Sequence, residues 1–424
     1  MIGEPQFKSY HAVVHLMVEI WLPYGVSEVP VRIPDENLID ILQPRPSEQP
    51  SVVDLDKIVS DELVTIAKNS SRVCIVVGES RNKELITNAT KSLANRFARE
   101  GIPASSLTIL RTPKSDAIVG LAPEVQVVHH SPENSLTIPC EGYSSDFIPS
   151  LNSLVTENVL TIAVGELRPN HFIGFSGLCD TIFPGLASEK SAHDQLVRSK
   201  PLDPHDLYKE RLEVTSNLHN VYGLGFVLNS ELSPIEVELG KFDETVGKLS
   251  ETLRRVATIQ ASKSADIVVM SVGGMPLDES LLTAVESFPA GLSVLKRNGA
   301  LIVAAECSLG HGNTDFYAWV KEHKEARHLE ARLRHRFNYN GWKAAYLLRV
   351  LNSHRVYLVS TIPDHHLEHT FGLKPAKTMN GALQSAQRAL GADASISVIP
   401  NAGHVIPSIP TSTQDSARQS GVTS

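Results

Sequence analysis

Short apolar runs alternate with amphipathic stretches along most of the chain. The run at 72–77 is apolar on successive residues, which is typical of a strand buried on both faces of a parallel sheet. Residues 83–99 carry apolar side chains at helical spacing, and further apolar runs follow at 106–110 and 125–128. Strand, helix and strand in this order predict a βαβ unit, and therefore an α/β fold with mostly parallel sheets.

The same alternation continues to the end of the chain. Residues 13–33 predict two short strands separated by a turn at 23–25. Further strands are expected at 158–164, 221–228, 266–270, 300–305, 355–359 and 395–399. Helical structure is expected over 190–220, 242–260, about 279–296, 314–350 and 380–390. The Pro- and polar-rich passage at 43–50 is interpreted as a surface connection.

The length of the chain, 424 residues, indicates more than one domain, because single hydrophobic cores stop growing at about 250–300 residues. The Ala/Ser/Lys stretch at 261–265 separates two complete α/β series. We therefore predict one α/β domain at 1–262, a second at 263–407, and a disordered polar tail at 408–424. Ligands of such sheets bind beyond the carboxyl ends of the strands, so an active-site cleft is expected between the domains.

Charge and composition narrow the choice of partners. The net charge of −8 argues against a duplex nucleic-acid binder, and the basic run at 327–336 is interpreted as a solvated helix face. The four cysteines are far apart, which indicates a reducing compartment without a disulfide framework. No signal-peptide pattern and no apolar run of ~18–20 residues is present. We expect a cytoplasmic protein that acts on a small molecule without membrane or nucleic-acid partners, with a homo-oligomer left open.

The glycine-rich segment at 169–185 is the first candidate for chemistry. Gly174, Gly177 and Gly185 would let backbone N–H groups approach a ligand, and Ser176 adds a hydroxyl. This pattern is compatible with a phosphate site that needs no lysine or arginine. The alternative is a turn that only reverses the chain.

Several histidines could supply metal ligands or a catalytic base. His171, Cys179, Asp180 and His193 are close in sequence, and imidazole and thiolate suit nickel, copper or zinc. Their spacing is not that of a metal motif, so surface or structural histidines remain the alternative. His130 follows the strand at 125–128, which is a favourable place for a base.

Several blocks together resemble the nickel-dependent lactate racemase family. They come in the family's order over about 13–407 and comprise Trp21-Leu22-Pro23-Tyr24-Gly25, Ile33-Pro34-Asp35-Glu36, Gly165-Glu166, His171, Gly174-Phe175-Ser176-Gly177, Pro184-Gly185, Gly273-Gly274, Pro276, Asp278, Glu306-Cys307, Gly310 and Gly312. The resemblance implies two α/β domains with an active site between them. It also implies racemisation or epimerisation of a 2-hydroxy acid or sugar acid by hydride transfer to a nickel-pincer nucleotide.

The resemblance also assigns roles to residues. Arg81 would bind the substrate carboxylate, His171 would carry the hydroxyl proton, and His193 would bind nickel. The remaining family positions would line the cofactor, and these are Gly174, Ser176, Gly177, Asp180, Gly185, Gly273, Gly274, Pro276 and Asp278. His130 is added as a second candidate base because it ends a strand.

Four departures from the family pattern change what is expected. The Asp-x-Thr-Arg-Pro loop is 78–82 here and keeps only its arginine, and the Gly-x-His-Arg loop falls near 110–113 without a histidine. The tethering lysine aligns with Asp180, and the Tyr-Gln-x-x-Lys run ends in Glu286. A non-covalent nucleotide is therefore expected. The alternatives are an elimination or isomerisation with an ordinary divalent metal at His171, Asp180 and His193, or a non-catalytic binder of a nucleotide or acid.

Overall fold

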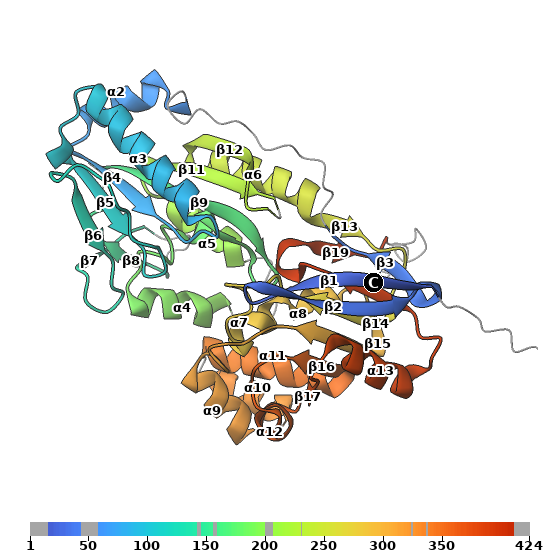
Figure 1. Cartoon of the computed structure of the whole chain (residues 1–424). Coiled ribbons are helices and arrows are strands. Elements are labelled where there is room, and N and C mark those ends of the chain that lie inside the picture. Colours follow the sequence, from blue (N-terminus) through green and yellow to red (C-terminus); the bar gives the residue numbers. More distant parts are fainter. Residues whose placement is uncertain are drawn as a thin grey trace, which may run out of the picture.

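The chain forms two α/β units that lie side by side (Figure 1). This computed structural model describes residues 16–43, 58–141, 146–155, 159–199, 207–229, 231–323, 325–335 and 338–410. We call residues 58–257 the first unit, and residues 16–43 with 258–410 the second unit. Mostly parallel sheets flanked by helices confirm the predicted α/β class, whereas the cleft between the domains stays a prediction.

In the described residues, the sheet of the first unit has seven strands. Their order is β12 (Pro234–Lys241), β11 (Val221–Leu228), β9 (Val159–Asn170), β4 (Arg72–Val77), β5 (Leu107–Arg111) and β6 (Gln126–His129), with β10 (Gly174–Gly177) paired to β9. The four pairs from β11 to β6 are parallel, while β12 and β10 are antiparallel to their neighbours. A short antiparallel pair, β7 (Thr137–Pro139) and β8 (Ser150–Asn152), lies beside this sheet.

Helices cover both faces of the first sheet, as the double-sided apolar character of β4 predicts. Val73, Ile75 and Val77 pack with residues of α2 (Asp61–Asn69) and α3 (Lys83–Arg99). Cys74 and Val76, which alternate with them, pack with residues of α6 (Phe242–Ala257). The other helices of this unit are α4 (Glu189–Ser199) and α5 (Leu207–Ser216).

The second unit contains a parallel sheet with six strands in the described residues. Their order is β17 (Lys374–Pro375), β16 (Arg355–Val359), β15 (Leu295–Ala304), β14 (Ala265–Ser271), β18 (Ile396–Ile399) and β3 (Leu38–Ile41). Its helices are α7 (Leu281–Ala284), α8 (Phe288–Leu292), α9 (Thr314–Glu322), α10 (Ala326–His335), α11 (Tyr339–Ser353), α12 (Asp364–His366) and α13 (Met379–Leu390).

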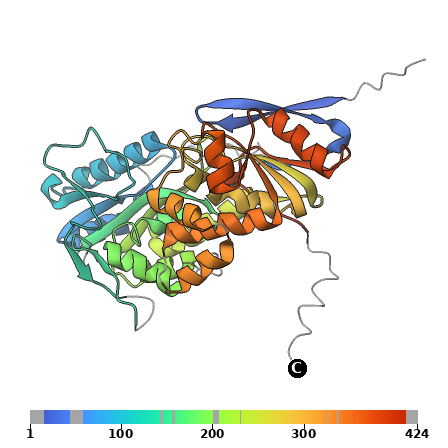
Figure 2. The ribbon, with the colours of Figure 1, turned by 90° about the horizontal axis from the view of Figure 1, so that it is seen from below.

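The N-terminal segment belongs structurally to the second unit. The hairpin of β1 (Met17–Tyr24) and β2 (Ser27–Pro34) packs on the second sheet beside α13, as Figure 2 shows. β3 then pairs with β18 at the edge of that sheet. The prediction of a first domain at 1–262 had placed this segment with the first sheet, since sequence order does not reveal which sheet a single short strand joins.

Two expected helices differ from the structure. The helix expected at 279–296 is a series of short turns, because Pro289 starts α8 afresh and β15 already begins at Leu295. The stretch at 314–350 is three helices, and Asn313 and Asn338 cap the first and last of them. None of the described helices combines the length and apolar character that crossing a lipid bilayer requires.

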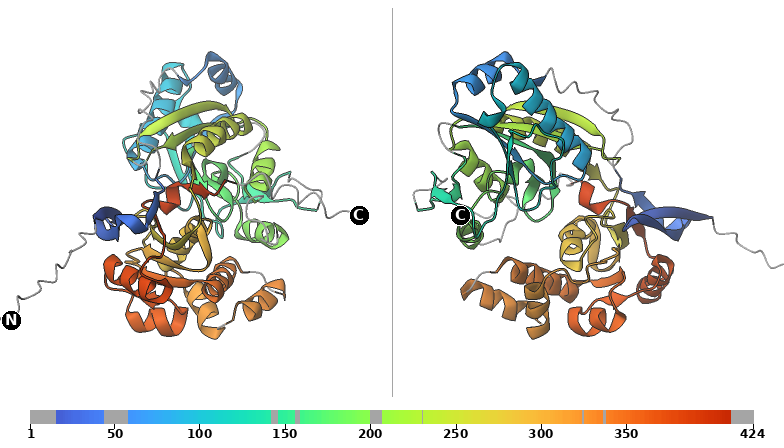
Figure 3. Two further views of the ribbon diagram at one scale, coloured as in Figure 1. Left: turned by 90° about the vertical axis from the view of Figure 1, so that its right-hand side faces the viewer. Right: turned by 60° about the vertical axis from the view of Figure 1, so that its left-hand side comes forward.

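The two units meet through strands and aromatic side chains. β13 (Thr258–Gln260), which follows α6, pairs in parallel with β19 (Ile406–Ser408) at the junction seen in Figure 3. Phe172 of the first unit packs edge-on against Trp342 and Tyr346 of the second, with ring centroids 4.9 and 4.8 Å away. Of the tail predicted at 408–424, Ser408 is the last residue of β19, and 411–424 lie outside the described residues.

Candidate active site

A buried ion pair lies at the carboxyl end of the first sheet. β4 and β9 are neighbouring parallel strands, so the turn after β4 brings Arg81 next to Glu166 of β9. Asn82 caps α3 by accepting a hydrogen bond from the N–H of Leu85, which fixes this turn. The Nε of Arg81 donates to Oε1 of Glu166 at 2.7 Å, and its Nη2 donates to the same oxygen.

The pair with Glu166 changes the role expected for Arg81. Burial alone would raise the pKa of Glu166, but the Arg81 guanidinium outweighs it and the pKa is lowered, so the carboxylate is ionised. Arg81 was expected to bind a substrate carboxylate, but its Nε and Nη2 already donate to Glu166. The Nη1 of Arg81 is buried and has no hydrogen-bond partner within the described residues.

Two more ion pairs lie near this one in the first unit. Arg168 of β9 donates to Glu79 at 3.0 Å. Arg211 of α5 donates to Asp180 at 2.9 Å, in the turn η3 (Leu178–Asp180). Asp180, where the resemblance places the tethering lysine, is thus the partner of a buried arginine.

The second unit has an ion pair of its own at the interface with the first unit. Lys343 of α11 donates to Glu286, the other position at which the resemblance expects a lysine. Burial alone would raise the pKa of Glu286, but Lys343 lowers it, with smaller contributions from Lys114 and Arg168 of the first unit. Burial likewise raises the pKa of Tyr339, which also senses Asp180 and Arg211. The charged groups of the two units therefore face one another across the junction.

His404 is a residue of this interface that the sequence analysis missed. It ends the turn η7 (Ala402–His404), which follows β18, and Gly403 N donates to Val272 O at 3.1 Å after the adjacent strand β14. Within the described residues, both ring nitrogens are buried without a hydrogen-bond partner. Burial lowers the pKa of His404 well below its usual 6.5, and Arg81 and Arg168 lower it further.

A signal for His404 was present in the sequence. The rule that ligands bind beyond the carboxyl ends of strands applies to the loop after 395–399 as much as to the others. Among the predicted residues, Gly273 lies against it, since a Cβ there would be 3.8 Å from Cε1 of His404.

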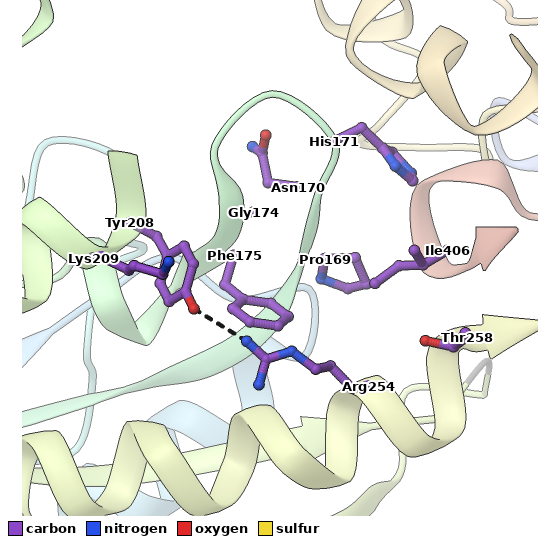
Figure 4. Close-up of a pocket in the computed structure, with 10 residues that line it drawn as sticks. All are labelled: Pro169, Asn170, His171, Gly174, Phe175, Tyr208, Lys209, Arg254, Thr258 and Ile406. Atoms are coloured by element: carbon purple, nitrogen blue, oxygen red, sulfur yellow. Dashed lines mark hydrogen bonds between the residues drawn. The ribbon is translucent and has the colours of Figure 1, made fainter. Parts of the chain in front are cut away.

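His171 lies at the tip of the β9–β10 hairpin and contacts the second unit. Its Nε2 is 2.9 Å from the carbonyl oxygen of Ala402, and its ring points toward β19 in Figure 4. The pocket drawn there has a volume of about 360 Å³ and includes His171 and Gly174 in its lining. Arg254 of α6 lies over the Phe175 ring in this pocket and donates to Tyr208 Oη at 3.1 Å. Among the described lining residues are neither Arg81 nor His193.

His130 is buried with both ring nitrogens engaged. Its Nε2 is 3.0 Å from the carbonyl oxygen of Ala187, and its Nδ1 is 3.0 Å from the side-chain amide of Asn152. These contacts leave no ring nitrogen for a substrate, and they make His130 a link between β6, β8 and the turn before α4.

His193 lies apart from the other predicted ligands. It is on α4 with 53% of its side chain exposed, and its Nδ1 is 3.7 Å from Asp194. In the described ranges no three His, Cys, Asp or Glu side chains are grouped so that they could hold a metal ion. The alternative of a divalent metal shared by His171, Asp180 and His193 therefore finds no support in the geometry.

Three of the predicted cofactor-binding glycines, Gly177, Gly185 and Gly274, have close backbone neighbours. A Cβ on Gly177, whose φ is +91°, would be 2.0 Å from the carbonyl oxygen of Glu166, and one on Gly185 would be 2.5 Å from that of Thr181. A Cβ on Gly274 would meet the turn of the β1–β2 hairpin, whose Gly25 N donates to Asp278 at 2.6 Å. These contacts, next to the cis peptide before Pro276, explain the glycines by packing.

These residues do not fit a nucleotide tethered through a lysine. The tether position holds a carboxylate already paired with Arg211. The hydroxyl of Ser176 is nevertheless buried without a partner in the described residues, as are the Nη1 of Arg81 and the His404 ring nitrogens. Buried polar groups of native proteins normally have partners, so a polar ligand next to any of these groups would satisfy it.

Comparisons with known proteins identify the family of this chain. The family model for the lactate racemase N-terminal domain matches residues 24–199, and that for the lactate racemase C-terminal domain matches residues 260–406. The chain is 26% identical to lactate racemase of Thermoanaerobacterium thermosaccharolyticum, with 92% of this chain and 99% of that protein covered. It is 25% identical to lactate racemase of Lactiplantibacillus plantarum, with 92% and 100% covered.

Solved structures give the same result. The apoprotein structure of lactate racemase from Thermoanaerobacterium thermosaccharolyticum superposes with a TM-score of 0.80 at 26% identity, over 92% of this chain and 100% of that one. A protein from Thermotoga maritima shares the fold at a TM-score of 0.54 and 14% identity, over 83% of this chain and 99% of that one.

Proposed function

This chain belongs to the lactate racemase family, and from that premise we propose that it binds a small 2-hydroxy acid between its two units and interconverts the configurations at C2. The relatives that are named lactate racemase support an isomerase. The proposal extends the substrate from lactate to 2-hydroxy acids with further hydroxyl groups, because the charged pair of Lys343 and Glu286 lies at the junction beside the aromatic contact of Phe172.

The observation that carries the proposal is the unpartnered Nη1 of Arg81 within the described residues. A buried N–H without a partner costs about 1–3 kcal/mol, and a carboxylate is the strongest acceptor that it could gain. Arg168 adds a second cation, which shares its charge with the half-exposed Glu79. A substrate carboxylate at this point would be bound by Arg81 and attracted by Arg168.

Racemisation requires that the C2–H bond break and re-form on the opposite face. The nickel-pincer nucleotide implied by the resemblance would supply hydride chemistry when bound, and here we propose a non-covalent nucleotide, because Asp180 cannot form the lysine linkage. The chain's own contribution is to bind the carboxylate, to keep the site away from bulk water and to handle the hydroxyl proton.

Chiral chromatography tests this proposal directly. Protein produced with the cofactor-synthesis proteins of the family, and separately without them, is incubated with single enantiomers of lactate, glycerate and malate. We expect the opposite enantiomer to form from at least one acid, and Arg168→Met to raise KM. Arg355→Met is the matched control, since Arg355 is an exposed arginine of the second sheet whose Nη1 donates to the backbone carbonyl of Asn298. Absence of conversion in both preparations, together with no binding of any of these acids, would overturn the proposal.

A further inference from the structure

His404 has an environment unlike that of the two buried or half-buried histidines described above. Within the described residues, its two ring nitrogens are both buried and both without a partner. By contrast, His130 has a partner at each nitrogen, and His171 bonds a backbone carbonyl. A buried imidazole that bonds nothing is costly, and each such group in a native structure calls for an explanation.

The position of His404 is set by both units. Its turn is attached to β14 through Gly403 and to the β9–β10 hairpin through the contact of Ala402 with His171. Gly273 leaves room beside its ring, because any side chain there would lie against Cε1. The charged groups of the first unit that act on it are Arg81 and Arg168, the two cations assigned above to the substrate carboxylate.

We propose that His404 is the catalytic residue that takes and returns the proton of the substrate's C2 hydroxyl group, an inference that rests on the function proposed above. In a 2-hydroxy acid the hydroxyl and the carboxylate are on adjacent carbons. The turn η7 contacts β9, the strand that carries Glu166, the partner of Arg81. The hydroxyl of an acid bound by Arg81 is therefore assigned to the side of His404.

The proton step balances within the site. A neutral imidazole has one nitrogen with a proton and one with a free electron pair. The O–H bond of the substrate breaks, an N–H bond forms on the free nitrogen, and the electron pair stays on the substrate oxygen. Burial lowers the pKa of His404, so the imidazole is neutral before the step and has a free electron pair for the proton.

The two arginines beside His404 also affect the charges that form during the proton transfer. Arg81 and Arg168 disfavour a lasting positive charge on the ring and favour negative charge on the substrate oxygen. No histidine occurs in the stretch near 110–113, where the resemblance expects one. His404 comes from a different segment and a different unit, so it would supply this function from the opposite side of the junction.

Two substitutions of His404 separate its hydrogen bond to the substrate hydroxyl from the transfer of the proton. The probe is 2-hydroxy-2-methylpropanoate, which has no hydrogen at C2 and cannot react, compared with 2-methylpropanoate, which lacks the hydroxyl. Wild-type protein is expected to bind the hydroxylated acid more tightly in calorimetry. His404→Leu removes this preference, whereas His404→Gln, which still forms hydrogen bonds, retains it.

Turnover gives the second readout. His404→Gln is expected to lower kcat by ~100–10,000-fold, the usual contribution of a general acid–base, with little change in probe affinity. His404→Gly with added imidazole should recover part of the rate, which a purely structural role would not allow. His354→Gln is the matched control, because His354 is also partly buried with a lowered pKa but lies at the end of α11.

The outcomes distinguish the two proposals. If wild-type protein neither converts nor binds any 2-hydroxy acid, the proposed function fails. If wild-type protein converts a substrate and His404→Gln does so at the same rate, or His404→Leu keeps the preference for the hydroxylated probe, the role of His404 is overturned while the function stands.

Discussion

The ring nitrogens of His130 and of His404 are buried at the carboxyl end of a parallel sheet, yet their surroundings differ completely. His130 follows β6 and has a partner at each ring nitrogen, both from its own unit. His404 follows β18, has no partner at either nitrogen among the described residues, and senses two arginines of the other unit. Both residues are histidines that follow a strand. The hydrogen-bond partners of the ring nitrogens therefore decide which of the two has a nitrogen available to a substrate.

The largest expected effect concerns the ion pair beside His404. Glu166→Ala leaves the Arg81 guanidinium buried and unpaired, so we expect the free energy of unfolding to fall by about 3–5 kcal/mol in urea denaturation. Asp116→Ala is the control, because its exposed pair with Lys83 should contribute little to stability. Equal losses in the two variants would contradict a buried, structurally required pair next to the site.

Substitution of the two histidines should separate them by stability. His130→Ala leaves the Asn152 amide and the Ala187 carbonyl without partners, and we expect a loss of about 2–4 kcal/mol. His404→Leu removes two unpartnered polar atoms and should change stability by no more than about 1 kcal/mol, in the stabilising direction. A larger loss of stability from His404→Leu than from His130→Ala would contradict the difference described between the two histidines.

The smallest effect is on the pH dependence of stability. The pKa of His404 in the folded protein is well below 6.5, so the unfolded chain binds the proton first and stability falls as pH drops below 6.5. The groups that act on the ring, Arg81 and Arg168, stay charged throughout. Relative to wild type, His404→Leu should gain about 1 kcal/mol between pH 7 and pH 5.5 in denaturation series. If the free energy of unfolding changed with pH in the same way in both proteins, folding would not lower the pKa of His404.

The sequence predicted the sheets better than the site. Apolar runs such as 72–77 and 395–399 became strands, because burial on both faces requires a local pattern that the chain carries by itself. The pairing of Arg81 with Glu166 joins residues 85 positions apart, and no local pattern shows it. Within the described residues, the ring nitrogens of His404 have no hydrogen-bond partner, and only the packed structure reveals this.

The pairing of β3 with β18 has a consequence for the order in which the protein folds on the ribosome. Leu38 is made long before its partner Ile396, because the whole first unit lies between them in the sequence. The first unit, continuous in sequence, can fold while the N-terminal strand still has an open edge, the kind of edge that invites pairing with other chains. The sheet of the second unit closes only when β18 has left the exit tunnel, and the turn with His404 is made directly after β18.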